Sequence, residues 1–423
     1  LEYPTIAVED GVAVQITPAR FEAARTSLDR DHRARAYTAF FQAFADHEHT
    51  LAALYGAQTQ ATIFLARARG HDSALAASLA EHDIPVAVYH NLVEAVGDNL
   101  APLHRWTALK KDLLGLDRFH DHDNSVTLFP ADKQEYSFER ACELVLAAVR
   151  PLGEQYVADL ERALVEGWVD PHESEGKSQG AYCSGPTDGT HPYVLMAWQG
   201  QVTDLFTLAH ELGHLMHAYY TVEAQPYQYA DYATFAAEVA SITNELLLAH
   251  HLIASAETPR ERLVQIEQEI NNVKLLYYWA TLLADFELQV YEAAESGESL
   301  TPTRLCTTMG DLFAKYYGPA LEVIEADTYL WGALRHVFYA DFYLYQYATS
   351  MAAAQQIVAD ILSDPDAAVR YCAFLRTGSS CSPLEALRRA GVDMTTPRPM
   401  LAVSARMEAL IDEFEELAAT AAP

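Results

Sequence analysis

The sequence predicts a mainly α-helical fold with one small β element, and three observations support this. Apolar residues recur at three- and four-residue spacing, the period of an amphipathic helix, over most of the chain. Residues 182–200 differ, because glycines and prolines there lead into a short apolar run, 193–198, as in a loop before a strand. Four prolines stand where helices are expected to begin, since proline suits the first helical turn: Pro18, Pro259, Pro302 and Pro365.

The helical spacing defines the expected elements in order along the chain. In the first half it predicts helices over residues 20–45, 50–69, 86–116 and 136–167. In the second half it predicts helices over residues 203–220, 234–253, 259–296, 302–317, 345–362, 365–377, 383–390 and 403–418. Residues 125–129 are a second extended candidate. A loop at 119–132 is the best boundary, dividing a helical lobe, 1–130, from a catalytic lobe, 131–423.

Composition argues against several classes of function. The chain of 423 residues has 28 lysines and arginines against 59 aspartates and glutamates, a formal net charge of −31. Such a surface repels nucleic acid and anionic membranes. No apolar run reaches the ~18 residues of a membrane span, we expect no signal peptide, and the five scattered cysteines suit free thiols. We therefore expect a cytoplasmic protein with no nucleic-acid or membrane partner, and its oligomeric state stays open.

The strongest chemical signal is a His-Glu-x-x-His motif at residues 210–214. Four residues apart on a helix, His210 and His214 lie on one face and can direct two imidazoles at one ion. Glu211 is offset from that pair and can reach a water in the open position of the ion, which it would deprotonate. The alternative is an ordinary amphipathic helix whose two histidines are satisfied by hydrogen bonds.

A third ligand is expected from the next helix. Tyr220 occupies the position where one group of zinc proteases has a further histidine, which excludes that group. Glu238 lies in an apolar run, where an acid is costly to bury unless it is paired or bound to a metal. Glu245 lies two turns further on the same face and would orient a ligating imidazole, with an ordinary salt bridge as the alternative. Two histidines and a glutamate suit zinc, although cobalt and manganese accept such ligands too.

Together with several other stretches, these motifs resemble the oligopeptidase F branch of the thimet oligopeptidase family. The resemblance keeps its order and spacing from about Asp10 to Leu417. The stretches that carry it are residues 180–182, 189–193, 207–214, 238–241 with Asn244-Glu245, 336–339, 342–349 and 390–394.

The resemblance implies a zinc endopeptidase of two helical lobes around a deep channel, with the small β element beside the active site, that cuts short unstructured peptides. His210, His214 and Glu238 would bind the zinc, Glu211 would be the general base, and Glu245 would support the ligands.

The resemblance also implies a donor pair for the tetrahedral oxyanion, formed by His336 and a tyrosine of the cluster that follows it. Tyr345 is the first choice for that tyrosine and Tyr339 is the second. A phenol suits the role because it stays protonated at neutral pH. The alternative for the tyrosine stripe is core packing.

Three residues are candidate contacts for the substrate. Tyr193 begins the expected strand 193–198, whose edge could pair with an extended substrate backbone, with a structural hairpin as the alternative. His217 lies near the ligand face of its helix and would contact substrate or pack beside the site. Tyr343 belongs to the tyrosine cluster.

Two other functions stay open at this point. A metallocarboxypeptidase would need a cation near the site for the terminal carboxylate of its substrate, and Arg335 is the nearest candidate. A truncated, inactive peptide-binding form is the other, because the chain begins with Leu1 and we expect it to lack the leading portion of the family.

The run His-Asp-His-Asp at residues 120–123 invites a second metal site. Alternating residues of a turn point in different directions, and Asn124 and Ser125, which favour turns, follow it. We therefore expect a solvated loop there.

Overall fold

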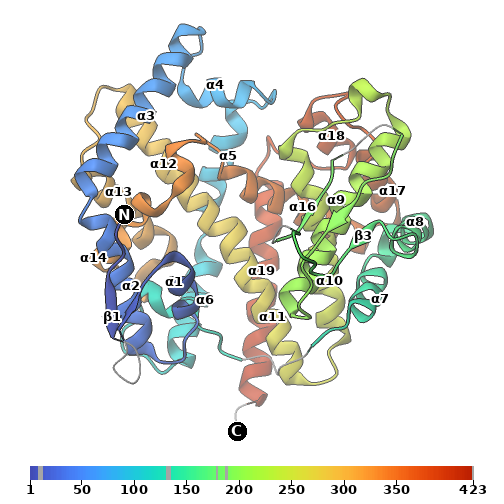
Figure 1. The fold of residues 1–423 in the computed structure, drawn as a ribbon, viewed down its shortest axis with the longest axis horizontal. Coiled ribbons are helices and arrows are strands. Elements are labelled where there is room, and N and C mark those ends of the chain that lie inside the picture. The colour runs from blue at the N-terminus through green and yellow to red at the C-terminus, as the bar shows by residue number, and fades with distance from the viewer. Residues whose placement is uncertain (8–12, 130–134, 178–179, 186–188, 422–423) are drawn as a thin grey trace. The chain divides into compact units, whose positions relative to one another are not determined.

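The computed structural model describes residues 1–7, 13–129, 135–177, 180–185 and 189–421, and it is mainly helical with two small sheets (Figure 1). The predicted fold class is thereby confirmed. The chain forms two compact units. The first comprises Leu1–Glu81, Val93–Leu128 and Tyr278–Tyr345, and the second His82–Leu92, Phe129–Tyr277 and Gln346–Pro423. The predicted lobe boundary between residues 130 and 131 lies outside the described residues, so the two lobes stay a prediction.

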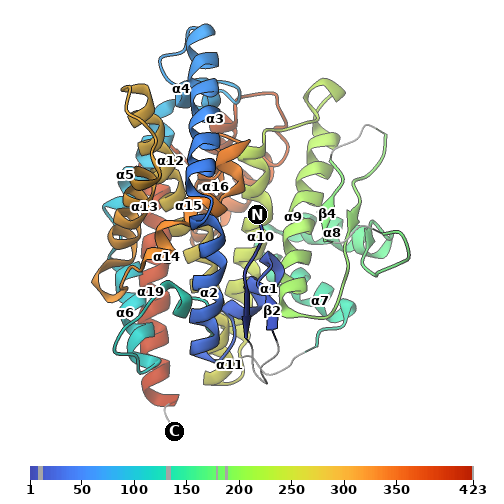
Figure 2. The same ribbon diagram turned by 60° about the vertical axis from the view of Figure 1, so that its left-hand side comes forward.

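The first unit is built around an aromatic core. Its elements are β1 (Thr5–Ala7), β2 (Ala13–Gln15), α1 (Pro18–Arg25), α2 (Arg30–Ala45), α3 (Glu48–Ala68), α4 (Ala74–Ala80), α6 (Ala101–Leu113), η2 (Asp121–Asp123), α12 (Ala280–Glu295), α13 (Pro302–Tyr317), η6 (Gly318–Ala320), α14 (Glu325–Thr328), α15 (Leu330–Ala333) and η7 (Arg335–Phe338). The antiparallel pair β1–β2 lies beside α1 and α2 (Figure 2). Phe21 stacks on Phe40 at 4.0 Å between ring centroids. This core holds the N-terminal helices together.

The second unit contains the whole His-Glu-x-x-His motif and the predicted third ligand. Its elements are α7 (Phe138–Ala148), η3 (Arg150–Leu152), α8 (Glu154–Val165), β3 (Val169–Asp170), β4 (Tyr182–Cys183), β5 (Val194–Leu195), α9 (Val202–Ala224), η4 (Tyr227–Tyr229), α10 (Thr234–Ser255), α11 (Pro259–Val273), α16 (Tyr345–Ser363), α17 (Pro365–Phe374), α18 (Pro383–Arg389) and α19 (Arg398–Ala421). Within it α9 lies along α10 and α11 along α19 (Figure 1). The helix α5 (Val86–Gly97) contributes residues to both units.

Three predicted helices are divided in the structure, because local capping signals interrupt the spacing. The helix expected over 20–45 is α1 and α2, since the carboxylate of Asp29 accepts the His32 N–H at 3.1 Å and so caps a new helix. The expected helix 86–116 is α5 and α6, with Pro102 in the first turn of α6. The expected helix 136–167 is α7 and α8, separated by Pro151 and by Gly153 at φ +101°.

Other elements follow the prediction or add to it. The helix expected over 259–296 is α11 and α12 joined through a π-helical turn, Lys274–Trp279. The hairpin β1–β2 and the short helices α4, α14 and α15 were not predicted, and the expected extended piece 125–129 forms no strand. None of the described helices is long and apolar enough to cross a bilayer.

The expected solvated loop at 120–123 is wrong, because this segment is the short helix η2 and its last side chain is buried. Asp123 is 0% exposed and accepts hydrogen bonds from Arg30 at 2.8 and 2.9 Å and from Arg33 at 2.9 Å. Both arginines come from α2, so η2 is tied to that helix by a buried ion-pair network. The cation partners lie about 90 residues away in the chain, which sequence spacing does not reveal.

Candidate metal centre

The helix α9 presents the His-Glu-x-x-His motif in its third and fourth turns. The helix begins at Val202, where the Asp204 carboxylate accepts the N–H groups of Gln199 and Gln201 at 2.9 Å each. This cap sets where the helix starts and therefore which face its later residues take. His210 and His214 follow on one face with their Nε2 atoms 3.2 Å apart.

The helix α10 approaches α9 closely because residue 213 is glycine. A Cβ atom at Gly213 would lie 2.6 Å from the Ala240 carbonyl oxygen and 2.6 Å from the Ser241 Cα, which no side chain tolerates. The buried Asn244 then ties the two helices, since its Nδ2 donates to the Ala209 carbonyl at 3.3 Å while its Oδ1 accepts from the Tyr156 hydroxyl at 3.1 Å. The contact places Glu238 opposite the two histidines.

Three side-chain atoms converge between these helices. The Oε2 of Glu238 lies 3.5 Å from the Nε2 of His210 and 3.7 Å from the Nε2 of His214. With the 3.2 Å between the two nitrogens, the triangle is close to the ~3.3–3.5 Å between ligands placed ~2.0–2.2 Å from a tetrahedral ion. Among the described residues, these three are the ones whose metal-ligating atoms come together in this way. The donors fit a zinc ion.

Two neighbours orient two of these three donors, His210 and Glu238. Glu245 accepts a hydrogen bond from the Nδ1 of His210 at 2.6 Å, which leaves the lone pair on Nε2 pointing into the triangle. Ser241 donates to the Oε2 of Glu238 at 3.1 Å. The contact of Glu245 fits the predicted role of orienting the imidazole, and that role stays a prediction.

The electrostatics of the centre follow from burial and from the three acids around it. Burial alone would lower the pKa of His210, but the hydrogen bond and charge of Glu245 outweigh it and raise that pKa. Burial and the charge of His210 lower the pKa of His214 to about 3, so this imidazole is neutral and its nitrogen can ligate.

Glu211 lies beside this triangle in a dry environment. Its side chain is 7% exposed, and its Oε2 has no hydrogen-bond partner among the described residues. Burial raises the pKa of Glu211, while the charge of His210 acts against that rise. A buried carboxylate oxygen that the protein leaves unpaired is suited to take a proton from a bound molecule.

The small β element packs against α9, the helix that carries the two histidines, and this agrees with the predicted β element beside the site. Its strand order is β3-β5-β4, so β5, which holds Val194–Leu195, is the central strand. The predicted free edge over 193–198 is therefore wrong, and β4 is an edge strand instead. Tyr193 itself is 53% exposed at the start of β5.

His217 does not face open space. It is 1% exposed and stacks on Tyr232 at 3.7 Å between ring centroids, with Phe374 at 5.4 Å. The packing alternative given for His217 fits this position. A role in binding substrate stays a prediction.

His336 and the tyrosines lie in the first unit, on an irregular segment, residues 334–345, which we call the arm. The ring of His336 stacks on Tyr343 at 5.5 Å and lies 5.8 Å from Tyr339. Tyr339 is 67% exposed, whereas Tyr345 is 1% exposed and burial raises its pKa. Three of the predicted residues are thus neighbours, and Tyr345 begins α16.

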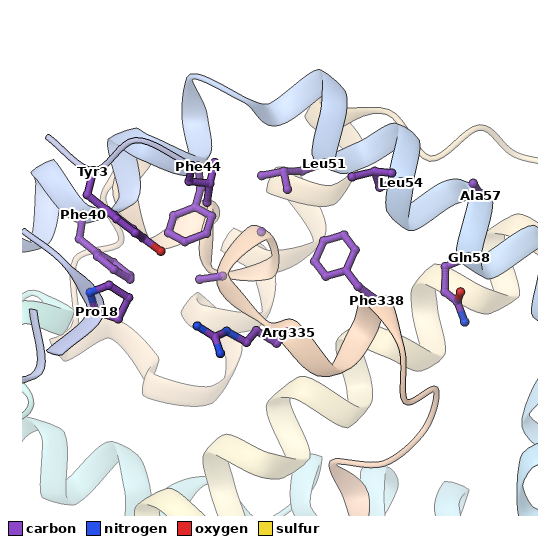
Figure 3. Close-up of a pocket in the computed structure, with 13 residues that line it drawn as sticks. Tyr3, Pro18, Phe40, Phe44, Leu51, Leu54, Ala57, Gln58, Arg335 and Phe338 are labelled. Atoms are coloured by element: carbon purple, nitrogen blue, oxygen red, sulfur yellow. The ribbon is translucent and has the colours of Figure 1, made fainter.

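Arg335, the cation required by the carboxypeptidase alternative, lies on the same arm. It extends from η7 into a groove of about 670 Å³ in the first unit, together with Phe338 (Figure 3). The lining is otherwise mostly apolar and includes Phe40, Phe44 and Leu54.

Sequence reasoning missed three residues that build the metal centre, namely Gly213, Ser241 and Asn244. A glycine inside a predicted helix costs ~1 kcal/mol relative to alanine, so Gly213 carried a signal of close packing. Ser241 is three residues after Glu238, within reach on one helix face. For Asn244 no spacing signal exists, because its partner Ala209 lies 35 residues earlier, and only the resemblance drew attention to this residue.

Comparisons with known proteins agree with this geometry. The model of peptidase family M3 matches residues 24–406. Oligopeptidase PepF of Bacillus subtilis is 38% identical over 418 residues, covering 99% of this chain and 62% of the relative. The crystal structure of oligoendopeptidase-F from Enterococcus faecium superposes with a TM-score of 0.81 at 30% identity, covering 99% of this chain and 70% of that one. Another crystal structure, of a Chlamydophila abortus protein, superposes with a TM-score of 0.93 at 32% identity, covering 98% of this chain and 69% of that one. The chain thus spans less than two thirds of the length of the Bacillus relative.

Proposed function

The chain belongs to peptidase family M3, and from that premise we propose that it is a zinc-dependent endopeptidase that hydrolyses short, unstructured peptides. The observation that carries the proposal is the convergence of His210, His214 and Glu238 beside the buried carboxylate of Glu211. A relative named oligopeptidase and a fold neighbour named oligoendopeptidase support the class of substrate.

The metal would be held by the two imidazoles and the carboxylate, a set that suits zinc and leaves one position open. When bound, zinc polarises the scissile carbonyl and makes water more acidic. Glu245 keeps the proton of His210 on Nδ1, and Ser241 holds the carboxylate of Glu238 in place. The ligand side chains are between 18% and 28% exposed, so a substrate can reach them.

Glu211 moves the proton in this proposal. Its carboxylate takes a proton from the attacking water and returns it to the nitrogen of the departing amine. The raised pKa of Glu211 supports this double role, because an acid–base catalyst works best when its pKa lies near the working pH. The unpaired Oε2 is the atom that would carry the proton.

We assign the stabilisation of the oxyanion to His336 and one phenol of the tyrosine cluster. Each preorganised donor of this kind lowers the activation barrier by ~2.7–4 kcal/mol. Tyr345 remains the first choice and Tyr339 the second, and the exposed position of Tyr339 beside His336 supports testing both. Tyr193, Tyr343 and His217 are proposed to line or support the substrate site.

The cytoplasm is the proposed compartment. All five cysteines are unpaired, which suits a reducing environment. Short peptides are the proposed partners, and nucleic acid is not expected at a net charge of −31.

The test is mass spectrometry of the products from a length series of unstructured peptides, with and without chelator, for the wild type and for Glu211→Gln. We expect internal cuts that disappear with chelator and fall by at least about 10²-fold in Glu211→Gln at unchanged zinc content. Glu223→Gln, an exposed acid on the same helix, is the matched control and should cleave at the parent rate.

Other outcomes would contradict the proposal. A ladder of single-residue products would favour the carboxypeptidase alternative, with Arg335→Ala as the following variant. Zinc binding without cleavage of any peptide would identify a peptide-binding form. Cleavage by Glu211→Gln at the parent rate would remove Glu211 from the mechanism.

A further inference from the structure

The arm has little regular structure of its own, although it carries His336. Between η7 and the start of α16 the backbone makes no helical or strand ladder. A donor aimed at a reacting atom must be held within about an ångström of its productive place, because larger displacements cost ~10²-fold in rate. The arm therefore needs anchors elsewhere in the first unit.

One anchor is a buried acid on α12. Glu287 is 1% exposed, and its Oε1 accepts the backbone N–H of Phe342 at 2.7 Å. Phe342 has φ +55°, the left-handed region that bulky residues rarely adopt unless their surroundings hold them there. Its ring lies 4.6 Å from that of Tyr291, on the same helix as Glu287. Glu287 thus meets the arm at its most constrained residue.

A second anchor joins the arm to α3 through the neighbouring residue. The Oδ2 of Asp341 accepts from the Thr62 hydroxyl at 2.5 Å and from the Gln58 amide at 3.0 Å. On the groove side, Phe338 packs on Tyr55 at 5.7 Å between centroids, and Figure 3 shows Gln58 and Phe338 at the same end of the groove. The helices α3 and α12 therefore both hold the arm between His336 and Tyr343, and Ser78 of α4 adds a hydrogen bond to the Asp341 carbonyl at 3.3 Å.

The protonation of Glu287 is part of this contact. Burial raises its pKa to about 8, the Phe342 N–H acts against the rise, and the charge of Asp341 adds to it. Tyr55 of α3 and Tyr291 of α12 also face this cluster, and burial raises the pKa of both phenols well above the neutral range. Near pH 7 Glu287 is thus a neutral acid beside one carboxylate, Asp341, and two neutral phenols.

We propose that Glu287 is a positioning residue, which fixes the arm through the Phe342 N–H so that His336 and its tyrosine partner are held for the oxyanion. This inference rests on the proposed function above. Nothing in the proposal requires Glu287 to touch substrate or metal. The bond to the Phe342 N–H needs an acceptor at Oε1, and an uncharged side chain avoids repulsion with Asp341; glutamine supplies both.

The experiment compares Glu287→Gln with Glu287→Leu, and uses Asp285→Asn as the matched control. Asp285 is a buried acid on the same helix that bonds Lys315 at 3.0 Å rather than the arm. For each purified variant, kcat and KM are measured from pH 6 to pH 9.5 on a cleaved peptide. Bound zinc is measured alongside, and amide hydrogen exchange is followed by mass spectrometry in peptides that cover residues 334–345.

We expect Glu287→Leu to lower kcat about 30- to 100-fold with KM within threefold and full zinc content. Its amide exchange should quicken in the arm and not elsewhere. Glu287→Gln should match the wild type at pH 7. Above about pH 8 the kcat of the wild type should fall as Glu287 ionises, while that of Glu287→Gln should not. Asp285→Asn should leave kcat and arm exchange unchanged.

Several results would overturn the inference. They are unchanged exchange in the arm of Glu287→Leu, an unchanged kcat despite faster exchange, or equal losses in the Gln and Leu variants. If the Leu variant does not fold, Thr62→Val removes one bond to Asp341, and the pH profile of Glu287→Gln still decides. A wild type that cleaves no peptide would refute the proposed function instead, and the exchange data would still test the anchor.

Discussion

The pair α9–α10 and the arm, residues 334–345, hold the two halves of the proposed chemistry by different means. In the helix pair, regular helical spacing places His210 and His214, and one glycine lets the second helix close on the first. In the arm His336 lies in the single short helix η7, and bonds to α3 and α12 hold the irregular residues that follow it. A ligand site can thus be set by local periodicity, whereas the donor segment depends on distant partners.

The two regions should therefore fail differently when altered. A change between α9 and α10 alters the distances among ligands, so metal and activity are lost together. A change in the arm or its anchors leaves the metal in place and lowers the rate. Zinc content and kcat, measured on the same variants, separate these two behaviours.

The largest effect is expected from Gly213→Ala. A Cβ atom there meets backbone atoms at 2.6 Å, so α10 must move away and take Glu238 with it. We expect loss of bound zinc and of activity, with ~1–3 kcal/mol lower stability. Metal analysis and thermal unfolding test this. Gly56→Ala in α3 is the control, because its nearest contact would be 4.0 Å away. A Gly213→Ala protein with full zinc would contradict the close-approach argument.

The next largest effect is a loss of kcat in the arm, and it distinguishes which tyrosine donates to the oxyanion. Replacing the tyrosine that donates to the oxyanion by Phe should lower kcat about 10²–10³-fold, with zinc content unchanged. Tyr345→Phe and Tyr339→Phe are compared on one peptide, with Tyr343→Phe beside them. If all three keep the parent kcat, the assignment of a phenol to the oxyanion is wrong.

A smaller effect is expected at Glu245. Removing the acceptor of the His210 Nδ1 proton should weaken zinc binding about 10–100-fold, because this contact fixes the ring and its tautomer. Competition with a chelator of known affinity measures the change for Glu245→Ala. Glu245→Gln keeps an acceptor oxygen and should lose less. Equal zinc affinity in all three proteins would reduce Glu245 to a surface ion pair.

The last effect concerns stability and leaves the metal and the reacting groups in place: it is the pH dependence of stability that the arm anchor produces. The pKa of Glu287 is about 8 in the folded chain and near 4.5 when unfolded, so the folded state binds the proton more tightly. Its contribution to stability is complete below about pH 4.5 and is lost as pH rises through about 8, at up to ~1.4 kcal/mol per pH unit. Urea unfolding of the wild type and Glu287→Gln at pH 6 and pH 8 measures the difference. Parallel curves would show that Glu287 does not titrate in that window.

The sequence by itself determined the helical class and named the candidate metal ligands. Helical period is a local property, so residues four apart share a face whatever surrounds the helix. That is why the His-Glu-x-x-His motif identified α9 before any coordinates, and why most helices of the second unit fall where their spacing places them. The apolar spacing continues from α1 into α2, so it predicted one helix. The break between the two helices is marked by Asp29, which caps α2.

Only the tertiary structure decided what depends on partners distant in the chain. These features are the central place of β5, the burial of Asp123 between arginines of α2, and the grip of Glu287 and Thr62 on the arm. Each joins residues that are separated by 11 to 279 positions along the chain. No periodic pattern encodes such a pair, because a buried polar group is satisfied by whichever partner the packing brings to it. The candidate ligands could be named from the sequence, but the contacts that hold them in place could only be seen in the fold.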